Sequence, residues 1–388
     1  MGNNNNDPGT EGTISNYQVH TLLFSALVGV SVLMMPRNIV IASRTDSEWV
    51  IFISGFIVLL FVWLIGALMK KFPRQNIIQF AQSMVGKKNQ RIMARILTLP
   101  FALALAGLWL WMASIVTRSF GEVLVSFVLP QTPIGVLMFS IIFVAAIVVS
   151  NPLVIIVRMT EFLLPFIYIT LPLLVAGLLQ EGSALNLLPL FQADWKEVAN
   201  GVFSSLLSYS GFSILFIYMA FYQQPEKSMR THTITIMVCT LFFWFAIVTS
   251  IGAFGSAEIF HLLYPPLELV KVTSFPGQVL DRLESLFIAI WMLAVFTTII
   301  LFFGSTVEVV MSYVPFKEKR RGWVTFLLAP IFYILAQYPS NLQELALWSQ
   351  WAGIAEIIIT LLFVAIFFIV WAVRERKKGE DNATTSPS

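Results

Sequence analysis

The sequence predicts an all-α integral membrane protein with about ten transmembrane helices. Of its 388 residues, 57% are hydrophobic and only 12% are charged, and the mean hydropathy is +0.82. Soluble domains carry roughly 25% charged residues. The apolar residues also form long runs, and about 20 such residues are enough to cross a ~30 Å hydrocarbon core as a helix. These observations exclude a nucleic-acid-binding protein and a soluble enzyme.

Ten apolar runs separated by polar breaks define the expected helices. In chain order they are Val19–Ile41, Trp49–Met69, Arg95–Phe127, Pro133–Val149, Val154–Leu179, Val198–Tyr222, Thr233–Phe254, Arg282–Val314, Gly322–Tyr338 and Leu345–Val373. Helices are expected because a lone strand in lipid would leave its backbone groups unpaired. Between the second and third runs, residues 75–87 separate apolar from polar side chains at helical spacing. We expect that segment to lie along the membrane surface.

The distribution of lysine and arginine predicts that both termini face the cytoplasm. Cytoplasmic loops hold the excess of these residues, and 18 of the 24 fall on the side of the N-terminus. The polar ends, residues 1–16 and 376–388, are expected to be disordered cytoplasmic tails. They flank a single transmembrane bundle over residues 17–375. We expect a first repeat over about 17–180 and a second over about 194–375.

Two of the predicted helices contain small residues at mid-membrane depth. These are Leu27–Ser31 in the first helix and Ser208–Ser213 in the sixth. Such interruptions at matching positions in two halves are typical of a transporter binding site. If both helices unwind, free N–H groups near Ser31 and Phe212 suit a carboxylate, and the carbonyls before the breaks suit an ammonium. The alternative is that these residues only allow close helix packing.

Several short motifs follow one another along the chain. They are Gly29-Val-Ser-Val-Leu-Met-Met-Pro36-Arg37 with Trp49, Thr117-Arg118 with Glu122, Asn186-Leu-Leu-Pro189, Ser210-Gly211-Phe212, and Arg282-Leu-Glu284-Ser285 with Trp291 and Phe296-Thr297-Thr298. Over about residues 14–375 the chain resembles the spore germinant-receptor B-subunit family, or spore permeases. That family belongs to the amino acid–polyamine–organocation superfamily. The resemblance implies a LeuT-like 5+5 inverted repeat with helices 1 and 6 interrupted.

The resemblance also implies a function. Such a subunit sits in the inner membrane of the bacterial spore with a membrane A subunit and a lipoprotein C subunit. It is expected to bind a small nutrient germinant, commonly an amino acid, and to trigger germination. Two positions depart from the family: Ser31 replaces a usual glycine, and Ser213 replaces a frequent acidic residue of helix six. A role assigned to that carboxylate cannot be carried over.

The expected ligand-binding residues lie on four helices. They are Val28, Gly29, Val30, Ser31, Gly107, Leu108, Met112, Tyr209, Ser210, Gly211, Thr297 and Thr298. The three from the third helix are expected on its inner face, where plain packing is the alternative. The two threonines follow from the family match, and their hydroxyls are otherwise expected to bond carbonyls of their own helix.

Ionisable residues inside the apolar runs are costly to bury in lipid, so we expect each of them to have a function or a partner. Arg118 and Glu122 are four residues apart and share a helix face, so we expect an ion pair. Arg158 and Glu161, three apart, are expected to pair as well. Near helix ends, three further acids are expected to reach headgroup water: Glu284, Glu308 and Glu356. The chain has no metal-ligand motif, and we expect no catalysis and no cofactor.

Two further expectations follow. A functional secondary amino-acid permease is the alternative to a germinant receptor, and uptake by the isolated chain would distinguish them. The segment Ala257–Gln278 carries apolar residues at helical spacing around Pro265-Pro266. Because a long loop without structure is unusual in a compact domain, we expect this segment to form a partly helical lid or docking element.

Overall fold

The computed structural model describes residues 12–85, 91–273, 283–314 and 317–384, which are almost entirely helical. The helices of the first half are α1 (Asn16–Val28), α2 (Ser31–Ser43), η1 (Arg44–Asp46), α3 (Ser47–Met69), α4 (Ile77–Val85), α5 (Arg91–Phe127), α6 (Ile134–Val149), α7 (Leu153–Tyr168), α8 (Thr170–Glu181) and η2 (Ala184–Leu187). Those of the second half are α9 (Trp195–Ser208), η3 (Phe212–Ile214), α10 (Leu215–Tyr218), η4 (Met219–Phe221), η5 (Pro225–Lys227), α11 (Ser228–Ile259), α12 (Pro265–Val272), α13 (Leu283–Met311), α14 (Lys317–Gln337) and α15 (Leu342–Thr384).

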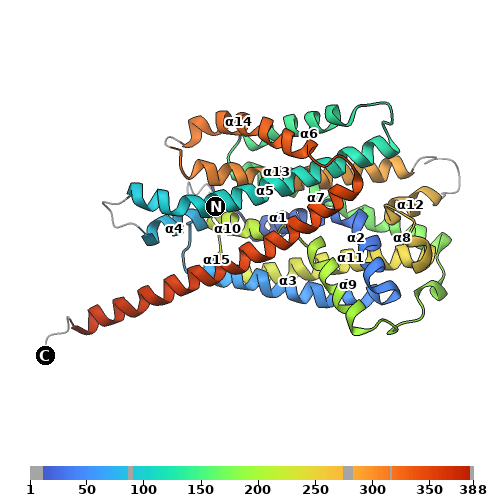
Figure 1. Cartoon of the computed structure of the whole chain (residues 1–388), viewed down its shortest axis with the longest axis horizontal. Helices are drawn as coiled ribbons and strands as arrows, with labels where there is room; N and C mark the ends of the chain where they lie inside the picture. Colours follow the sequence, from blue (N-terminus) through green and yellow to red (C-terminus); the bar gives the residue numbers. More distant parts are fainter. Residues whose placement is uncertain (1–11, 86–90, 274–282, 315–316, 385–388) are drawn as a thin grey trace, which may run out of the picture.

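The long helices run along one axis of the molecule (Figure 1). In the described part of the chain, six helices are long and apolar enough to cross a membrane. The number becomes eight if each of the two bent pairs counts as one span. The shorter apolar helix α6 and the 21-residue helix α14 match the two remaining predictions. Each of the ten predicted helices therefore has a counterpart in the structure.

The chain ends differ from the prediction. Residues 1–11 lie outside the described part, but Ile14 is only 1% exposed and forms a parallel bridge to Tyr222. Its N–H donates to the carbonyl of Phe221 at 2.7 Å, and its carbonyl accepts from the N–H of Gln223 at 2.9 Å. At the other end α15 stays helical to Thr384, because its Arg-, Lys- and Glu-rich extension consists largely of good helix formers. The described bridge and helices thus extend beyond the predicted bundle at both ends.

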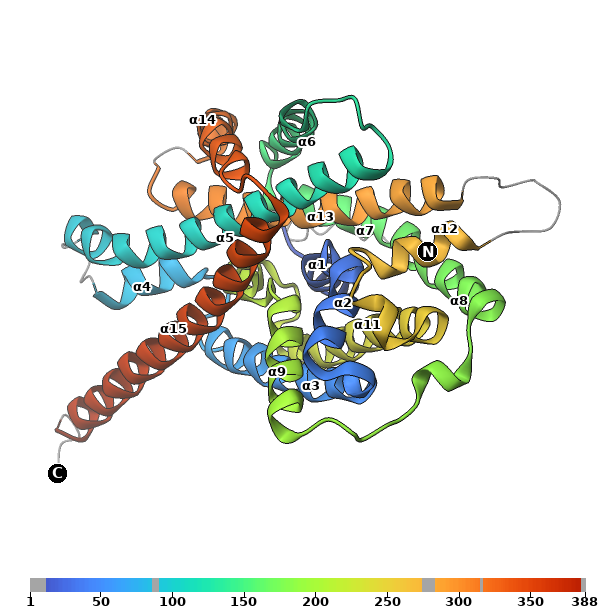
Figure 2. The same cartoon turned by 45° about the vertical axis from the view of Figure 1, so that its right-hand side comes forward.

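The first interrupted span lies inside the bundle (Figure 2). All residues from Thr21 to Val28 are buried, and α1 packs against α7, α11 and α13, while α2 packs against α9 and α11. On one side of the molecule α14 pairs with α6, and α15 crosses the bundle obliquely against α5, α3 and α9. The first half of the first interrupted span, α1, is therefore enclosed by other helices of the bundle.

Two short helices match segments predicted from amphipathic spacing. The segment over residues 75–87 contains α4, whose Ile77, Ile78 and Phe80 are buried and which packs against α5. The expected lid contains α12, which starts at the Pro265-Pro266 pair, where proline at the first helical positions costs no hydrogen bond. This helix packs against α8, α13 and α2. Residues 274–278 of the expected lid lie outside the described residues.

A buried ion pair ties three helices of the scaffold together. Glu308 of α13 is 8% exposed and Arg321 of α14 is 7% exposed, and their closest N and O atoms are 2.6 Å apart. The Arg321 Nε also donates to the carbonyl of Val149 at the end of α6, at 3.0 Å. The expectation that Glu308 reaches headgroup water was therefore wrong, because Arg321 neutralises it inside the bundle.

Breaking this pair on one side should destabilise the protein strongly. Glu308→Ala leaves the Arg321 guanidinium buried without its carboxylate, and we expect a loss of about 3–5 kcal/mol. The double variant Glu308→Leu/Arg321→Met removes both charges and should lose less than the single variant. Thermal unfolding in detergent micelles measures both. A single variant as stable as the double variant would contradict the structural role of the pair.

Candidate functional site

Both interrupted spans are broken where the sequence predicted. The axes of α1 and α2 differ by 52° across Gly29-Val30, and those of α9 and the segment Phe212–Phe221 differ by 46°. In the second break Gly211 has a φ of +129°, which an L side chain rarely adopts. The half-helices begin at Ser31 and Phe212, the two positions expected from the sequence.

The two breaks lie close to one another and to α13. A Cβ on Gly211 would stand 2.8 Å from the carbonyl oxygen of Ala26 in α1, and a Cβ on Gly29 would stand 2.2 Å from Oγ1 of Thr298 in α13. Thr298 donates from that hydroxyl to the carbonyl of Ser25 at 2.6 Å. The absence of side chains on both glycines thus allows the α1 region, the second break and α13 to meet at the centre of the bundle.

A carboxylate from α15 occupies the second break. Glu356 is fully buried, and its two oxygens accept hydrogen bonds from the N–H of Gly211 at 2.9 and 3.0 Å and from the N–H of Ser213 at 3.0 Å. N–H groups at the start of a helix have no partner within the helix and attract negative charge. The expectation that Glu356 reaches headgroup water was therefore wrong.

Ser213 joins a third helix to the same point. The Trp109 indole of α5 is fully buried and donates to the Ser213 Oγ at 2.9 Å. Position 213 is where the sequence departs from the resembled family by lacking an acidic side chain. In this fold a carboxylate nevertheless contacts that residue, because Glu356 supplies it from α15.

The predicted residues of the two breaks have different surroundings. Val28 and Gly29 are buried, and Val30 and Ser31 are half-buried. Val30 caps the start of α2 without any side-chain hydrogen bond, in contrast to the Glu356 carboxylate at the other break. The Tyr209 hydroxyl turns away to α11, where it donates to Thr240 Oγ1 at 2.9 Å.

The remaining predicted residues divide between inward and outward faces. Leu108 and Met112 are buried, but Gly107 is exposed with nothing within 4 Å of an added Cβ. The expectation that Gly107 lies on the inner face of its helix was wrong, because the helical turn between neighbours directs Trp109 and Leu108 inward and Gly107 outward. Two hydroxyls donate to carbonyls three residues earlier in the chain: Ser210 to Leu207 O and Thr297 to Ala294 O, both at 2.7 Å.

Sequence reasoning missed two of the central residues. Glu356 lies in the middle of the last apolar run, and an acid at that depth was the available signal, since such residues are expensive in lipid unless they are paired. Trp109 stood beside the predicted Leu108 without any distinguishing pattern. Its contact with Ser213 joins residues 104 positions apart, which no local spacing reveals.

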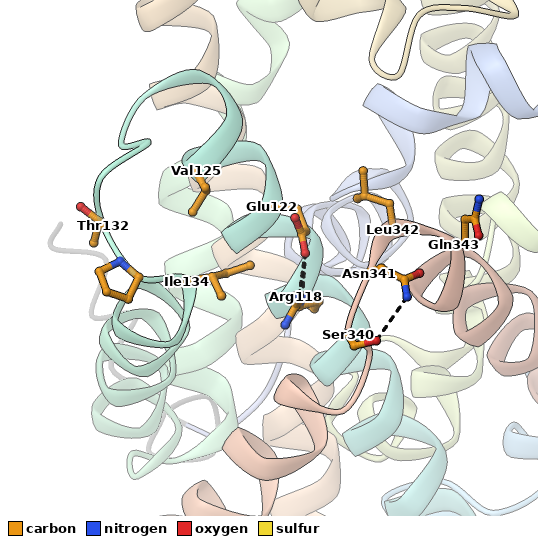
Figure 3. A pocket seen from close by; sticks show the side chains of 10 residues that line it. Arg118, Glu122, Val125, Thr132, Ile134, Ser340, Asn341, Leu342 and Gln343 are labelled. Atoms are coloured by element: carbon orange, nitrogen blue, oxygen red, sulfur yellow. Dashed lines mark hydrogen bonds and ion pairs between the residues drawn. The ribbon is translucent and has the colours of Figure 1, made fainter.

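A separate cavity of about 710 Å³ opens near the end of α5 and the start of α15 (Figure 3). Its lining includes Arg118, Glu122, Val125, Thr132, Pro133, Ile134, Ser340, Asn341, Leu342 and Gln343. The expected Arg118–Glu122 ion pair is present, with N and O 2.7 Å apart. The expected pairing of Arg158 with Glu161 is absent among the described side chains, and Glu161 instead accepts from Gln18 Nε2 at 2.8 Å. None of the predicted ligand-binding residues lines this cavity.

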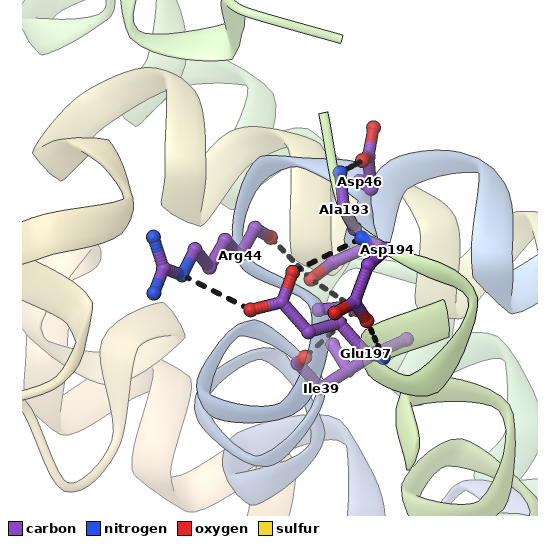
Figure 4. Close-up of polar contacts among 8 residues, drawn as sticks. Ile39, Arg44, Asp46, Ala193, Asp194 and Glu197 are labelled. Atoms are coloured by element: carbon purple, nitrogen blue, oxygen red, sulfur yellow. Dashed lines mark hydrogen bonds and ion pairs between the residues drawn. The ribbon is translucent and has the colours of Figure 1, made fainter. Parts of the chain in front are cut away.

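Asp46 joins the segment that follows α2 to the segment that precedes α9 (Figure 4). This residue follows α2, is 1% exposed, and accepts from the N–H of Phe191 at 2.5 Å and of Ala193 at 2.6 Å, just before α9. Its Oδ1 also accepts from the Trp49 indole at 3.0 Å. Burial opposes ionisation of Asp46, but the hydrogen bonds from Ala193, Trp49 and Phe191 outweigh it and hold the pKa of this carboxyl below its ordinary value.

The two interrupted spans and the helix arrangement define a membrane protein with a LeuT-like fold. The structure of MhsT in complex with L-phenylalanine aligns with this chain at a TM-score of 0.65 and 15% sequence identity. The alignment covers 90% of this chain and 88% of the MhsT chain. Residues 13–345 match the family model described as spore germination protein. The chain belongs to that family, whose members are non-enzymatic membrane proteins.

Curated relatives extend over nearly the whole chain. Spore germination protein YndE of Bacillus subtilis (strain 168) is 24% identical over 372 residues, which cover 95% of this chain and 98% of the relative. Spore germination protein GerLB of Bacillus cereus is 24% identical over 371 residues, covering 95% and 96%. Spore germination protein B2 of Bacillus subtilis (strain 168) is 22% identical, covering 96% and 99%. The family resemblance read from the motifs is thus confirmed.

The contact of Gly29 with Thr298 gives a test of the first break. Gly29→Ala places a methyl group against the Thr298 hydroxyl and displaces it from Ser25, and overpacking of this kind costs about 1–3 kcal/mol. Gly29→Ala/Thr298→Ala should be less destabilised than the sum of its single variants, with a coupling of about 1 kcal/mol or more in a double-mutant cycle of thermal unfolding.

Gly107→Ala is the matched control, since open space surrounds that glycine on the same bundle. Alanine there should leave stability unchanged or raise it by up to about 1 kcal/mol through helix propensity. If Gly29→Ala and Gly107→Ala behave alike, the close approach of α13 to the break is not what holds Gly29 in place.

Asp46 gives a test that depends on pH. The pKa of Asp46 is lower in the folded protein than in the unfolded chain. Its ionised carboxylate therefore adds fully to the free energy of unfolding above the ordinary carboxyl pKa, about 3.9, and this stabilisation is lost as pH falls through the folded pKa. We expect Asp46→Asn to melt below wild type at pH 7, with the difference shrinking below about pH 4. Melting temperatures in micelles at pH 7 and pH 3 measure this. A difference that is constant with pH would contradict it.

Proposed function

We propose that the chain is the germinant-binding membrane subunit of a spore germination receptor, and that its ligand is an α-amino acid bound where the two interrupted spans meet. The central observation is the pair of breaks, which approach one another at the centre of a LeuT-like fold. Membership of the spore germination family supports the receptor role. The bound L-phenylalanine in the MhsT structure supports the amino-acid class of the ligand.

The charges of the two breaks suggest how such a ligand is oriented. The ligand ammonium contacts carbonyls that end α1 and α9, near Val28 and Tyr209, where the negative end of each half-helix dipole lies. The ligand carboxylate binds at the start of α2, near Ser31, since Val30 provides no side-chain cap there. Leu108 and Met112 are buried apolar residues of α5 and favour a ligand with an apolar side chain.

The receptor setting completes the proposal. The subunit works in the inner membrane of the spore with a membrane A subunit and a lipoprotein C subunit, as the family resemblance implies. Both termini face the spore core, in accordance with the 18 of 24 lysine and arginine residues on that side. Ligand binding between the interrupted spans changes their packing, and the partner subunits detect that change.

A secondary amino-acid permease is the second candidate, and one observation favours it. Both bent spans of the transporter fold are retained, with bends of 52° and 46°, although a pure sensor does not need a route across the membrane. Uptake of radiolabelled amino acids into proteoliposomes that contain the purified chain alone distinguishes the two. Robust uptake supports the permease, and binding without uptake supports the receptor.

The binding proposal predicts a selective thermal shift. Purified protein is screened in micelles against the twenty amino acids and simple sugars. At one hundred times its dissociation constant, a ligand stabilises the native state by about 2.7 kcal/mol, which raises the melting temperature by several degrees. We expect this for a few apolar amino acids, and a loss of the shift for their C-terminal amides. A screen in which only sugars shift the melting temperature would overturn the amino-acid assignment.

A further inference from the structure

Glu356 is a buried acid for which neither the scaffold nor the ligand orientation above assigns a role. It has no exposed surface, and among the described residues none of the ion pairs involves it. A carboxylate in the apolar interior is costly unless hydrogen bonds or a cation compensate it. Here three contacts from the backbone N–H groups of Gly211 and Ser213 provide that compensation. The carboxylate therefore binds to the break as a free anion binds to a helix start.

The packing of α15 brings this carboxylate to the break. One turn before Glu356, a Cβ on Gly353 would stand 2.8 Å from Leu207 Cδ2 and 3.1 Å from Ser210 Oγ, at the end of α9. The glycine thus allows α15 to lie directly against the interrupted span. Oε1 accepts from the N–H groups of both Gly211 and Ser213, and Oε2 shares the Gly211 N–H, so both oxygens act as acceptors. An amide side chain with its oxygen at the Oε1 position would direct its NH2 group toward the Gly211 N–H donor.

We propose that Glu356 is a positioning residue that serves as the internal anionic ligand of the second break and restricts recognition of a ligand carboxylate to the first break, at the start of α2. The first part stands on the contacts of Glu356 alone. The second part rests on the proposed function, since it concerns an amino-acid ligand. The two parts are tested separately.

Replacement of the internal ligand by a free one tests the first part. Glu356→Ala removes the Cγ, the Cδ and both oxygens, which together match the size of acetate. We expect the variant to melt lower than wild type, and acetate to restore much of the loss. Sodium chloride at equal ionic strength and the neutral isostere acetamide should restore none. Equal effects of acetate and chloride would overturn the proposal.

Thr360→Val is the matched control on the same helix, one turn further along. Thr360 is 1% exposed, and its hydroxyl has no hydrogen-bond partner among the described residues. This variant should melt within a degree or two of wild type, and acetate should not change it. Stabilisation of Thr360→Val by acetate to the same extent would show that acetate acts generally and not at the break.

Glu356→Gln keeps the first part testable if the alanine variant does not fold. Glutamine has nearly the same shape, but one acceptor becomes a buried NH2 group facing N–H donors. We expect its melting temperature to fall on the order of 5 °C, since a buried unsatisfied donor is destabilising. A glutamine variant as stable as wild type would show that the negative charge is not needed, and would overturn the proposal.

The second part uses the amino-acid panel. Wild type and Glu356→Ala, the latter with saturating acetate, are screened against the twenty amino acids. We expect the same amino acids to stabilise both, because acetate and the ligand carboxylate bind at different breaks. If acetate abolishes, in the variant, an amino-acid shift that wild type also shows, acetate and that ligand compete for the second break and the proposed restriction is wrong. If no amino acid stabilises even wild type, the proposed function fails, while the acetate result stands on its own.

Discussion

The structure depends on satisfying backbone N–H and C=O groups where no water is present. A continuous helix in lipid meets this requirement by itself, but each interruption exposes groups that need partners. At the second break Glu356 of α15 provides acceptors for Gly211 and Ser213, and at the end of α1 the Thr298 hydroxyl donates to the Ser25 carbonyl. The breaks can therefore persist only while α13 and α15 remain docked against them. Folding of the second half is in this sense a condition for the geometry of both interrupted spans.

Close approach is the second requirement, and glycine meets it at each contact between these spans. Gly29 faces Thr298, Gly211 faces the Ala26 carbonyl, and Gly353 lets α15 reach the end of α9. Helix association in lipid relies on such packing because lipid tails are as apolar as the helix surfaces. The hydrophobic effect therefore does not drive the helices together. The buried pair of Glu308 and Arg321 adds a charged link between α13, α14 and α6. The central contacts are thus held by continuous helices that are themselves fixed to one another.

Features with a local signature were predictable from the sequence, and features made by distant residues were not. Small residues in two apolar runs predicted both breaks, and the half-helices begin at Ser31 and Phe212 as expected. The Arg118–Glu122 pair followed from spacing along one helix. In contrast, Glu356 contacts residues more than 140 positions away, and Ile14 joins a segment over 200 positions away, so neither contact leaves a local pattern. Gly107 was misassigned because a run that is apolar on every side does not reveal which face is inward.

The bridge between Ile14 and Tyr222 has a practical consequence for anyone who labels this protein. It joins Ile14 to the end of the segment Phe212–Phe221, the second half of an interrupted span. A fluorophore attached shortly before Ile14 therefore reports on that half-span, and a bulky fusion at the same place would disturb its packing. A probe at the end of α15 instead follows the helix that carries Glu356. Reporters at these two positions would therefore follow two different parts of the structure.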